Sequence, residues 1–224
     1  ARHIKLADPD VLSGSNLNRI RTGFNNLDVP KTIAVARQIY EINPYAIVEI
    51  FPEGLTENNM QSFLKGNSKL DVLVEEMDNP YFKLLVREYA RKYRIPVIMA
   101  ADNADSIIVD VERYDWNKKL PLLHGILGKM TSKDFKQVAP KDLPNVLAKM
   151  AGANLSTVRM LESVMQVGRT LYSWPQLGNA ATLCGAVLTY LARNIVVGAK
   201  LPSGRTDFNV AAFFVPPTKA EQKQ

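Results

Sequence analysis

The residues best suited to bind a ligand form one polar segment near the start of the chain. Asp8 and Asp10 follow a predicted strand at 4–7, and Asn16 and Arg19 come soon after. An acid at the carboxyl end of a strand lies where open α/β sheets bind ligands, and it can accept hydrogen bonds from ribose hydroxyls. Asn16 and Arg19 project together if their segment turns helically, and a guanidinium can bond two phosphate oxygens at once. The segment predicts a polyphosphate site; the alternative is a turn stabilised by the acids, with Arg19 as a surface charge.

Lys31 and Asp78 could complete such a site. Lys31 lies in the first turn of a predicted helix, where the helix dipole disfavours a cation by a few tenths to about 1 kcal/mol. A nearby anion would explain this position, since helix N-termini bind phosphate. Asp78 follows a predicted strand, and a carboxylate at this edge can hold Mg²⁺ through one oxygen. The alternatives are a solvated Lys31 and an Asp78 that caps the next helix.

The elements that must position these residues alternate at short spacing through the first half of the chain. This alternation is typical of a parallel sheet covered by helices. We expect strands at 4–7, 46–51, 70–74, 95–100 and 107–111. We expect helices after the caps Asp28 and Thr56, ending before Asn43 and Gly66, and a third helix at 79–93.

The second half has a different character. Residues 115–144 are rich in Lys, Pro and Gly, which predicts loops and short helices over the sheet. Helices are expected at 155–167 and 177–197. The latter falls short of the roughly 20 clean apolar residues of a membrane span, so we interpret it as a buried core helix. We expect a core at 1–112, its continuation in the same domain at 113–215, and a polar tail at 216–224.

Composition argues against several classes of site and partner. The 224 residues are 46% hydrophobic and 22% charged, as in ordinary soluble domains, with a net charge of +6. One cysteine and two histidines leave no internal disulfide and no cysteine-based zinc site, and they favour a reducing, cytoplasmic setting. Basic and aromatic residues do not interleave, so nucleic acid is not an expected partner, and neither is a membrane.

Three further residues could carry chemistry. Cys184 lies in an apolar helix without a cationic neighbour in sequence that could lower its pKa, so we interpret it as core packing. His124 is interpreted as a hydrogen-bonded structural histidine, with a general base as the alternative. The basic turn at Ser203 to Arg205 has no assigned task.

Taken in order, the polar motifs resemble the ThiF/MoeB and ubiquitin-activating-enzyme superfamily. The motifs are Asp8-Pro9-Asp10, Ser15-Asn16-Leu17-Asn18-Arg19, Pro30-Lys31, Ile42-Asn43-Pro44 and Asp78-Asn79. The resemblance implies a Rossmann-like α/β fold, with a mostly parallel sheet and flanking helices. It also implies an adenylyltransferase that activates a carboxylate with Mg-ATP to an acyl-adenylate and pyrophosphate. Less specifically, the segments 111–115 and 174–176 resemble the ThiF-like portion of bacterial proteins that carry a nitroreductase-like domain.

The resemblance also implies a role for each candidate residue. Asp8 would bind the ribose and Asp10 would lie beside it in the nucleotide site. Asn16, Arg19 and Lys31 would bind the phosphates, and Asp78 would bind magnesium. Arg19, Lys31 and Asp78 would therefore carry catalysis. Expected partners are ATP, a carboxylate substrate (a small protein, a peptide or a small acid) and a second copy of the chain in a homodimer.

The chain also departs from the family pattern. Ile20 stands where the family usually has Gln, and only seven residues precede Asp8. We therefore expect the first strand and the glycine-rich loop of the fold to be missing from this chain. The Cys-x-x-Cys pairs of many relatives are absent, so no zinc is expected. Two alternatives stay open: a catalytically degenerate binding or dimerisation module, and an NAD(P)-dependent oxidoreductase domain.

Overall fold

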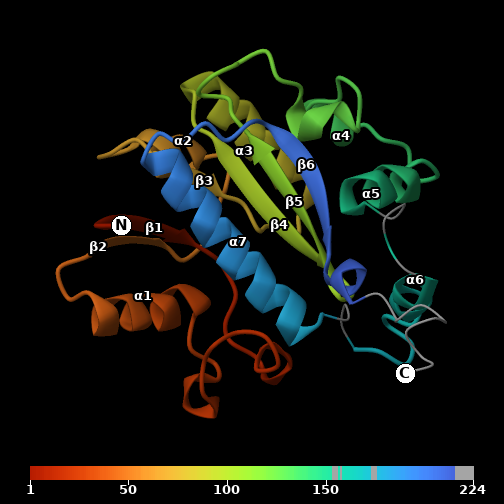
Figure 1. Ribbon diagram of the computed structural model, residues 1–224, viewed down its shortest axis with the longest axis horizontal. Helices are drawn as coiled ribbons and strands as arrows, with labels where there is room; N and C mark the ends of the chain where they lie inside the picture. Colours follow the sequence, from red (N-terminus) through yellow and green to blue (C-terminus); the bar gives the residue numbers. More distant parts are fainter. Residues whose placement is uncertain (153–155, 157, 173–175, 215–224) are drawn as a thin grey trace, which may run out of the picture.

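The strands form two separate sheets, which lie on either side of a long helix in the view of Figure 1. In the first, β1 (His3–Ala7) pairs in parallel with β2 (Ile47–Phe51). The second has the order β3 (Leu73–Val74), β4 (Val97–Asn103), β5 (Ser106–Glu112) and β6 (Gly204–Asn209). β3 and β4 are parallel, whereas β4–β5 and β5–β6 are antiparallel. The Rossmann-like α/β class is confirmed, and the larger sheet is mixed.

The computed structural model describes residues 1–152, 156, 158–172 and 176–214. The predicted polar tail at 216–224 and most of the motif at 174–176 lie outside these ranges. The helices are α1 (Lys31–Ile42), α2 (Met60–Lys65), α3 (Pro80–Tyr93), α4 (Ser132–Phe135), α5 (Leu143–Ala151), α6 (Val158–Val164) and α7 (Gly178–Val196). Short 3₁₀ turns are η1 (Gly14–Asn16), η2 (Phe24–Asn26), η3 (Leu122–Gly125) and η5 (Val210–Phe213).

The two predicted caps, Asp28 and Thr56, are wrong, and so is the alternative that Asp78 caps the third helix, whereas the start of that helix at Asn79 is as predicted. Asp28 has a φ of 63°, and α1 begins only after Pro30, without a side-chain cap. The Thr56 hydroxyl accepts a hydrogen bond from the Asn59 amide, which closes a turn ahead of α2 rather than capping it. The cap of α3 is Asn79, whose side-chain oxygen accepts from two amides of the first turn. Asp78 is therefore not a helix cap, and its carboxylate is available for another use.

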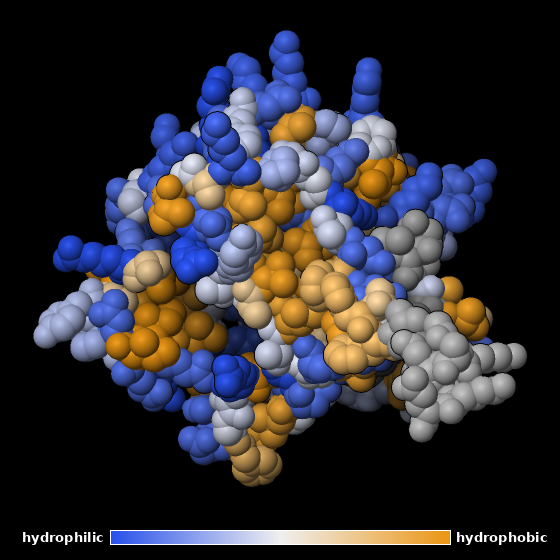
Figure 2. Space-filling model, viewed as in Figure 1, coloured by the Kyte–Doolittle hydropathy of each residue, from blue (hydrophilic) through white to orange (hydrophobic). Residues whose placement is uncertain are grey.

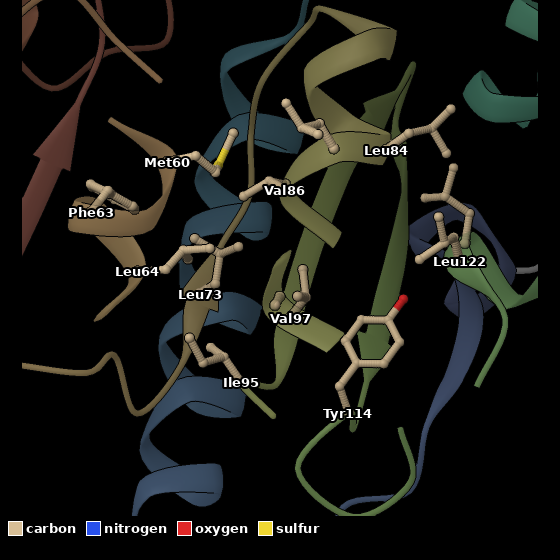
Figure 3. Close-up of a cluster of buried hydrophobic side chains, with 13 residues drawn as sticks. Met60, Phe63, Leu64, Leu73, Leu84, Val86, Ile95, Val97, Tyr114 and Leu122 are labelled. Atoms are coloured by element: carbon tan, nitrogen blue, oxygen red, sulfur yellow. The ribbon is translucent and has the colours of Figure 1, made fainter. Parts of the chain in front are cut away.

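Two apolar clusters hold the fold together. The first lies where α2, α3 and η3 meet β3 and β4, and Figure 3 shows its side chains, among them Leu64, Leu73 and Tyr114. The second lies between α7 and the β4–β5 hairpin, and α7 supplies Ala180, Cys184, Leu188, Leu191 and Ile195. These residues recur every three or four positions, so they form one stripe of the helix. The prediction that α7 is a core helix is confirmed, and none of the helices within the described ranges is both long and apolar enough to cross a membrane.

A buried charge cluster fixes the segment that follows β3. Arg87 of α3 is fully buried and donates hydrogen bonds to Glu75 and to Glu112, the last residue of β5. Glu112 also accepts from the Tyr114 hydroxyl and, at 2.8 Å, from the Leu123 amide. Buried charges are tolerated when they are paired and hydrogen-bonded in this way. The cluster joins α3, β5 and η3 and sets the position of the residues after Glu75.

β6 is a strand that the sequence patterns did not predict. Arg205, assigned only to a basic turn, lies in β6 and donates from Nε and Nη2 to the two oxygens of Asp110 at 2.8 and 2.6 Å. Asp110 is fully buried in β5. This paired arrangement attaches β6 to the outer edge of β5.

The strand predicted at 70–74 is reduced to Leu73 and Val74. Across the described part of the chain, β1 pairs only with β2, and β3 pairs only with β4, so each has one edge without a strand partner. Both edge strands are parallel to their neighbours. The expectation that the first strand and the glycine-rich loop of the fold are missing from this chain stays a prediction.

Candidate nucleotide and substrate sites

Asp8, Asp10 and Lys31 meet at the carboxyl end of β1. The Lys31 ammonium lies 2.6 Å from Asp10 Oδ2 and 3.8 Å from Asp8 Oδ2. The backbone holds this arrangement, because the Lys31 amide donates to the Asp10 carbonyl and the Asp10 amide donates to Asp8 Oδ1. The structure thus brings together three of the predicted site residues. Lys31 has two acidic neighbours here, so an incoming phosphate would compete with them for its charge.

Asn16 and Arg19 lie in the η1 turn. Asn16 is buried, and its Oδ1 accepts from the Ser13 amide and hydroxyl at 3.0 and 3.2 Å. Asn16 therefore fixes the turn through its oxygen. Arg19 Nη1 donates to the Ser15 carbonyl and to Asn18 Oδ1, at 2.7 and 3.0 Å. None of the described residues accepts from Arg19 Nε or Nη2, which leaves two donors for a ligand.

Arg19 lines an open hollow of about 690 Å³ between residues 17–21 and the first half of α7. The approach of these two elements is close, because a Cβ on Gly178 would lie 2.4 Å from the Asn18 carbonyl oxygen. Arg21 contributes a second cation to the same hollow. This surface can accept an anion, as the sequence predicted for Arg19.

Asp78 belongs to a different cavity of about 720 Å³. Its walls come from residues 76–83, the end of β4, and helices α5 and α6. Asp78 is exposed and makes no hydrogen bond to any described residue. The described residues contain no group of three or more side chains suited to hold a metal ion. One free carboxylate suits Mg²⁺, which usually keeps several water ligands, but none of the predicted nucleotide ligands at 8–31 lines this cavity.

Glu76 is a candidate that the sequence analysis missed. It lines the cavity beside Asp78, and its Oε1 accepts from the Ala100 amide at 2.9 Å. Solvent reaches part of the Glu76 side chain, although many protein atoms lie around its carboxyl group. This burial, together with the nearby charges of Glu75 and Asp102, raises the pKa of Glu76 to about 7. The signal for Glu76 in the sequence was a pair of acids, Glu75 and Glu76, directly after a predicted strand.

Two adjacent residues at the end of β4, Asp102 and Asn103, line the same cavity. Asp102 Oδ1 accepts from Gln176, and Asn103 Oδ1 accepts from Ser156, at 3.0 and 2.7 Å. Asp102 Oδ2 and Asn103 Nδ2 are buried and have no hydrogen-bond partner among the described residues. The first is an acceptor and the second a donor, and both are fixed in place by their bonded neighbours.

Cys184 lies in the core, as the sequence predicted, whereas the buried His124 Nε2 has no hydrogen-bond partner among the described residues. Cys184 is buried against the sheet, and burial is the main cause that raises its pKa to about 12. A thiol with so high a pKa is a poor nucleophile. His124 Nε2 lies 3.3 Å from Asp110 Oδ1, beneath the sheet edge that β6 covers. Neither residue lines the two cavities described above.

Comparison with known proteins gives both near and distant relatives. The chain is 36% identical over 210 residues to the uncharacterized protein MT1398 of Mycobacterium tuberculosis, covering 93% of this chain and 28% of that protein. It is 29% identical over 99 residues to the adenylyltransferase and sulfurtransferase UBA4 of Yarrowia lipolytica, covering 44% of this chain and 24% of that protein. The chain therefore spans about a quarter of the length of these relatives.

Solved structures share the fold at low sequence identity. The crystal structure of Escherichia coli MccB superimposes with a TM-score of 0.57 at 12% identity, covering 92% of this chain and 55% of that one. The crystal structure of PaaA gives 0.56 at 16% identity, covering 93% and 60%. Residues 1–158 match the model of the ThiF family. Because this match extends over most of the chain, the protein belongs to the ThiF family.

Proposed function

We propose that this chain is an adenylating domain that activates a carboxylate with ATP. The observation that carries the proposal is the cluster of Asp8, Asp10 and Lys31 at the end of β1 in a ThiF-family chain. The relative UBA4 is named an adenylyltransferase, and one solved structure of MccB contains ATP. Both names support the same chemistry for this chain.

The residues present fit a nucleotide by the chemistry of their side chains. Asp8 Oδ2 lies at the longer distance from Lys31, so this oxygen can accept a hydrogen bond from a ribose hydroxyl. Lys31 and Arg19 offer cationic donors to phosphate oxygens, and Arg19 keeps two donors open. Bound Mg²⁺, held by Asp78, would neutralise part of the phosphate charge.

The proposed reaction forms one bond and breaks one. A carboxylate oxygen of the substrate attacks the α-phosphorus of ATP, and the bond from that phosphorus to the bridging oxygen of the β-phosphate breaks. The products are the acyl-adenylate and pyrophosphate. The protein contributes mainly position and charge, since phosphoryl-type transfer needs the reactants in line and the developing charge neutralised. Arg19 and Lys31 supply the positive charge in this proposal.

Substrate and assembly form part of the same proposal. The substrate is a carboxylate on a small protein, a peptide or a small acid. We also propose a homodimer, with a cytoplasmic location suggested by the single buried thiol. Hydrophobic atoms follow the course of α7 across the face shown in Figure 2, and Val196 and Val197 near its end are 59% and 72% exposed. An apolar helix face of this kind supports an interface between two copies. Light scattering tests the dimer.

The test of the nucleotide site is calorimetric titration with ATP. Arg19→Ala and Lys31→Ala should each weaken binding about ten- to a hundred-fold, because each removes a charge-assisted contact of about 1.5–3 kcal/mol. Asp78→Asn should weaken binding only when magnesium is present. Arg37→Ala is the matched control, since Arg37 is an exposed cation on the same helix as Lys31. Unchanged affinity in all three site variants would remove this assignment.

Isotope exchange between pyrophosphate and ATP, with candidate carboxylates added, tests the reaction itself. Exchange that depends on one carboxylate identifies an adenylyltransferase. ATP binding without exchange for any carboxylate would instead favour the degenerate binding module.

A further inference from the structure

The cavity that contains Asp78 has the features of a ligand site in its own right. It lies beyond the carboxyl ends of the parallel strands β3 and β4, where ligands of α/β proteins bind. Its volume of about 720 Å³ is in the range of small-molecule sites. Much of its wall is apolar, with Met77, Met99 and Leu147 among the lining residues. An aliphatic group would therefore be stabilised inside it.

The polar side of the cavity specifies what else the ligand must carry. Asn103 is 4% exposed, and its Nδ2 is a buried donor without an acceptor among the described residues. Within the same ranges, Asp102 Oδ2 is a buried acceptor without a donor. Buried polar atoms are nearly always hydrogen-bonded, so an orphan donor and an orphan acceptor on neighbouring residues call for a ligand that supplies both partners. A carbonyl oxygen suits Asn103, and an N–H group suits Asp102.

The charge around the cavity favours a cationic N–H group. Three carboxylates line it, those of Glu76, Asp78 and Asp102, together with one cation, Lys83. The Lys83 ammonium is already bonded to both oxygens of Glu75, at 3.0 and 3.2 Å. The described lining therefore carries an excess of negative charge. An ammonium group would relieve it, whereas a substrate carboxylate would be repelled.

We propose that this cavity binds the amino end of a peptide whose first side chain is aliphatic. The ammonium group bonds to Asp102, the adjacent carbonyl accepts from Asn103, and the side chain lies against the methionine-rich wall. The proposal rests on the proposed function in one respect: it takes the ligand to be the molecule whose carboxylate is activated. In such a peptide the carboxylate lies at the opposite end of the molecule from the ammonium group that enters the cavity.

The experiment measures binding of a probe directly, without ATP. L-leucinamide carries the ammonium, the carbonyl and the aliphatic side chain but no carboxylate, and 4-methylpentanamide lacks only the ammonium. Calorimetry should show that the protein binds leucinamide at least about ten-fold more tightly, as expected for a charge-assisted hydrogen bond. Equal binding of the two probes, or binding of neither at millimolar concentration, would overturn the proposal.

A matched pair of variants locates the bound probe. Asp102→Asn should weaken leucinamide binding about ten-fold by removing the charge. Asp105→Asn is the control, since Asp105 is exposed at the tip of the same hairpin and does not line the cavity. Equal affinity of the two variants for leucinamide would also overturn the proposal. If Asp102→Asn does not fold, the comparison of the two probes on the unsubstituted protein still tests the proposal. ATP titration separates the two hypotheses: lost leucinamide binding with intact ATP binding contradicts this inference alone, and absent ATP binding contradicts the proposed function.

Discussion

Replacing Arg205 by alanine tests whether the buried Asp110 depends on its partner across the β5–β6 pair. Burial by itself would raise the pKa of Asp110, yet the hydrogen bonds and charge of Arg205, together with the nearby His124, hold it at about 2, below the usual 3.8. At about 1.4 kcal/mol per pKa unit, the difference corresponds to about 2 kcal/mol of stability. Because the pKa is lower in the folded state, this stability is present above pH 3.8 and is lost as the pH falls towards 2.

Without Arg205, the carboxylate stays buried and keeps only His124 beside it. Removing one partner of a buried pair costs about 3–5 kcal/mol, so we expect Arg205→Ala to lose about 3 kcal/mol near neutral pH. The pKa of Asp110 should then rise, and the loss should shrink in acid, where the carboxyl group is neutral. Arg205→Lys keeps the charge without the two-pronged bond and should lose less.

Urea unfolding, followed by circular dichroism over a series of pH values, measures these free energies. The double variant Asp110→Asn/Arg205→Ala is the control, because it removes the buried charge together with its partner. It should recover more than half of the stability that Arg205→Ala loses. An ordinary surface substitution changes the free energy of unfolding by about 0.5 kcal/mol or less. A change no larger than this for Arg205→Ala would refute the reasoning.

Three further substitutions follow from other parts of the structure. Gly178→Ala should destabilise the protein by about 1–3 kcal/mol, since the added Cβ meets the Asn18 carbonyl. Gly185→Ala, where no atom lies within 4 Å of the added Cβ, should instead raise the melting temperature, and the reverse order would contradict the packing described here. Cys184→Ala should lose about 1–2 kcal/mol through packing while adenylation persists; a folded but inactive variant would indicate a thioester. Glu76→Gln should gain stability relative to the original protein as the pH rises above 4.5, with the full gain above about pH 7, because the raised folded-state pKa of Glu76 means that its ionisation disfavours folding; a gain independent of pH would exclude this cause.

Elements with a strong local pattern could be predicted from the sequence. The helix expected at 177–197 is observed at Gly178–Val196, because its apolar stripe repeats over five turns. β6 could not be predicted in the same way. Its residues are polar and mostly exposed, and they form a strand only because β5 offers hydrogen bonds and Asp110 needs a cation. A residue almost a hundred positions away therefore decides the local structure.

The candidate site also has one part that could be predicted from the sequence and one that could not. Asp8, Asp10 and Lys31 were predicted to share one site because a strand end and a helix start lie close in sequence, but their contact with one another was not predicted. The cavity at Asp102 and Asn103 was not foreseen, because it exists only where α5 and α6 lie against the end of β4. Neither residue stands in a recognisable motif, so only the packed structure shows their unused polar atoms.

The distance along the chain between β5 and β6 also has a consequence during synthesis. The two partners Asp110 and Arg205 are 95 residues apart, and ribosomes add about 5–20 residues per second. A nascent chain therefore carries the completed β4–β5 hairpin for about 5 to 20 s before β6 leaves the ribosome. During this interval the outer edge of β5 is open to pairing with other chains. Slow translation after α7 would prolong this exposure and increase the demand for chaperones.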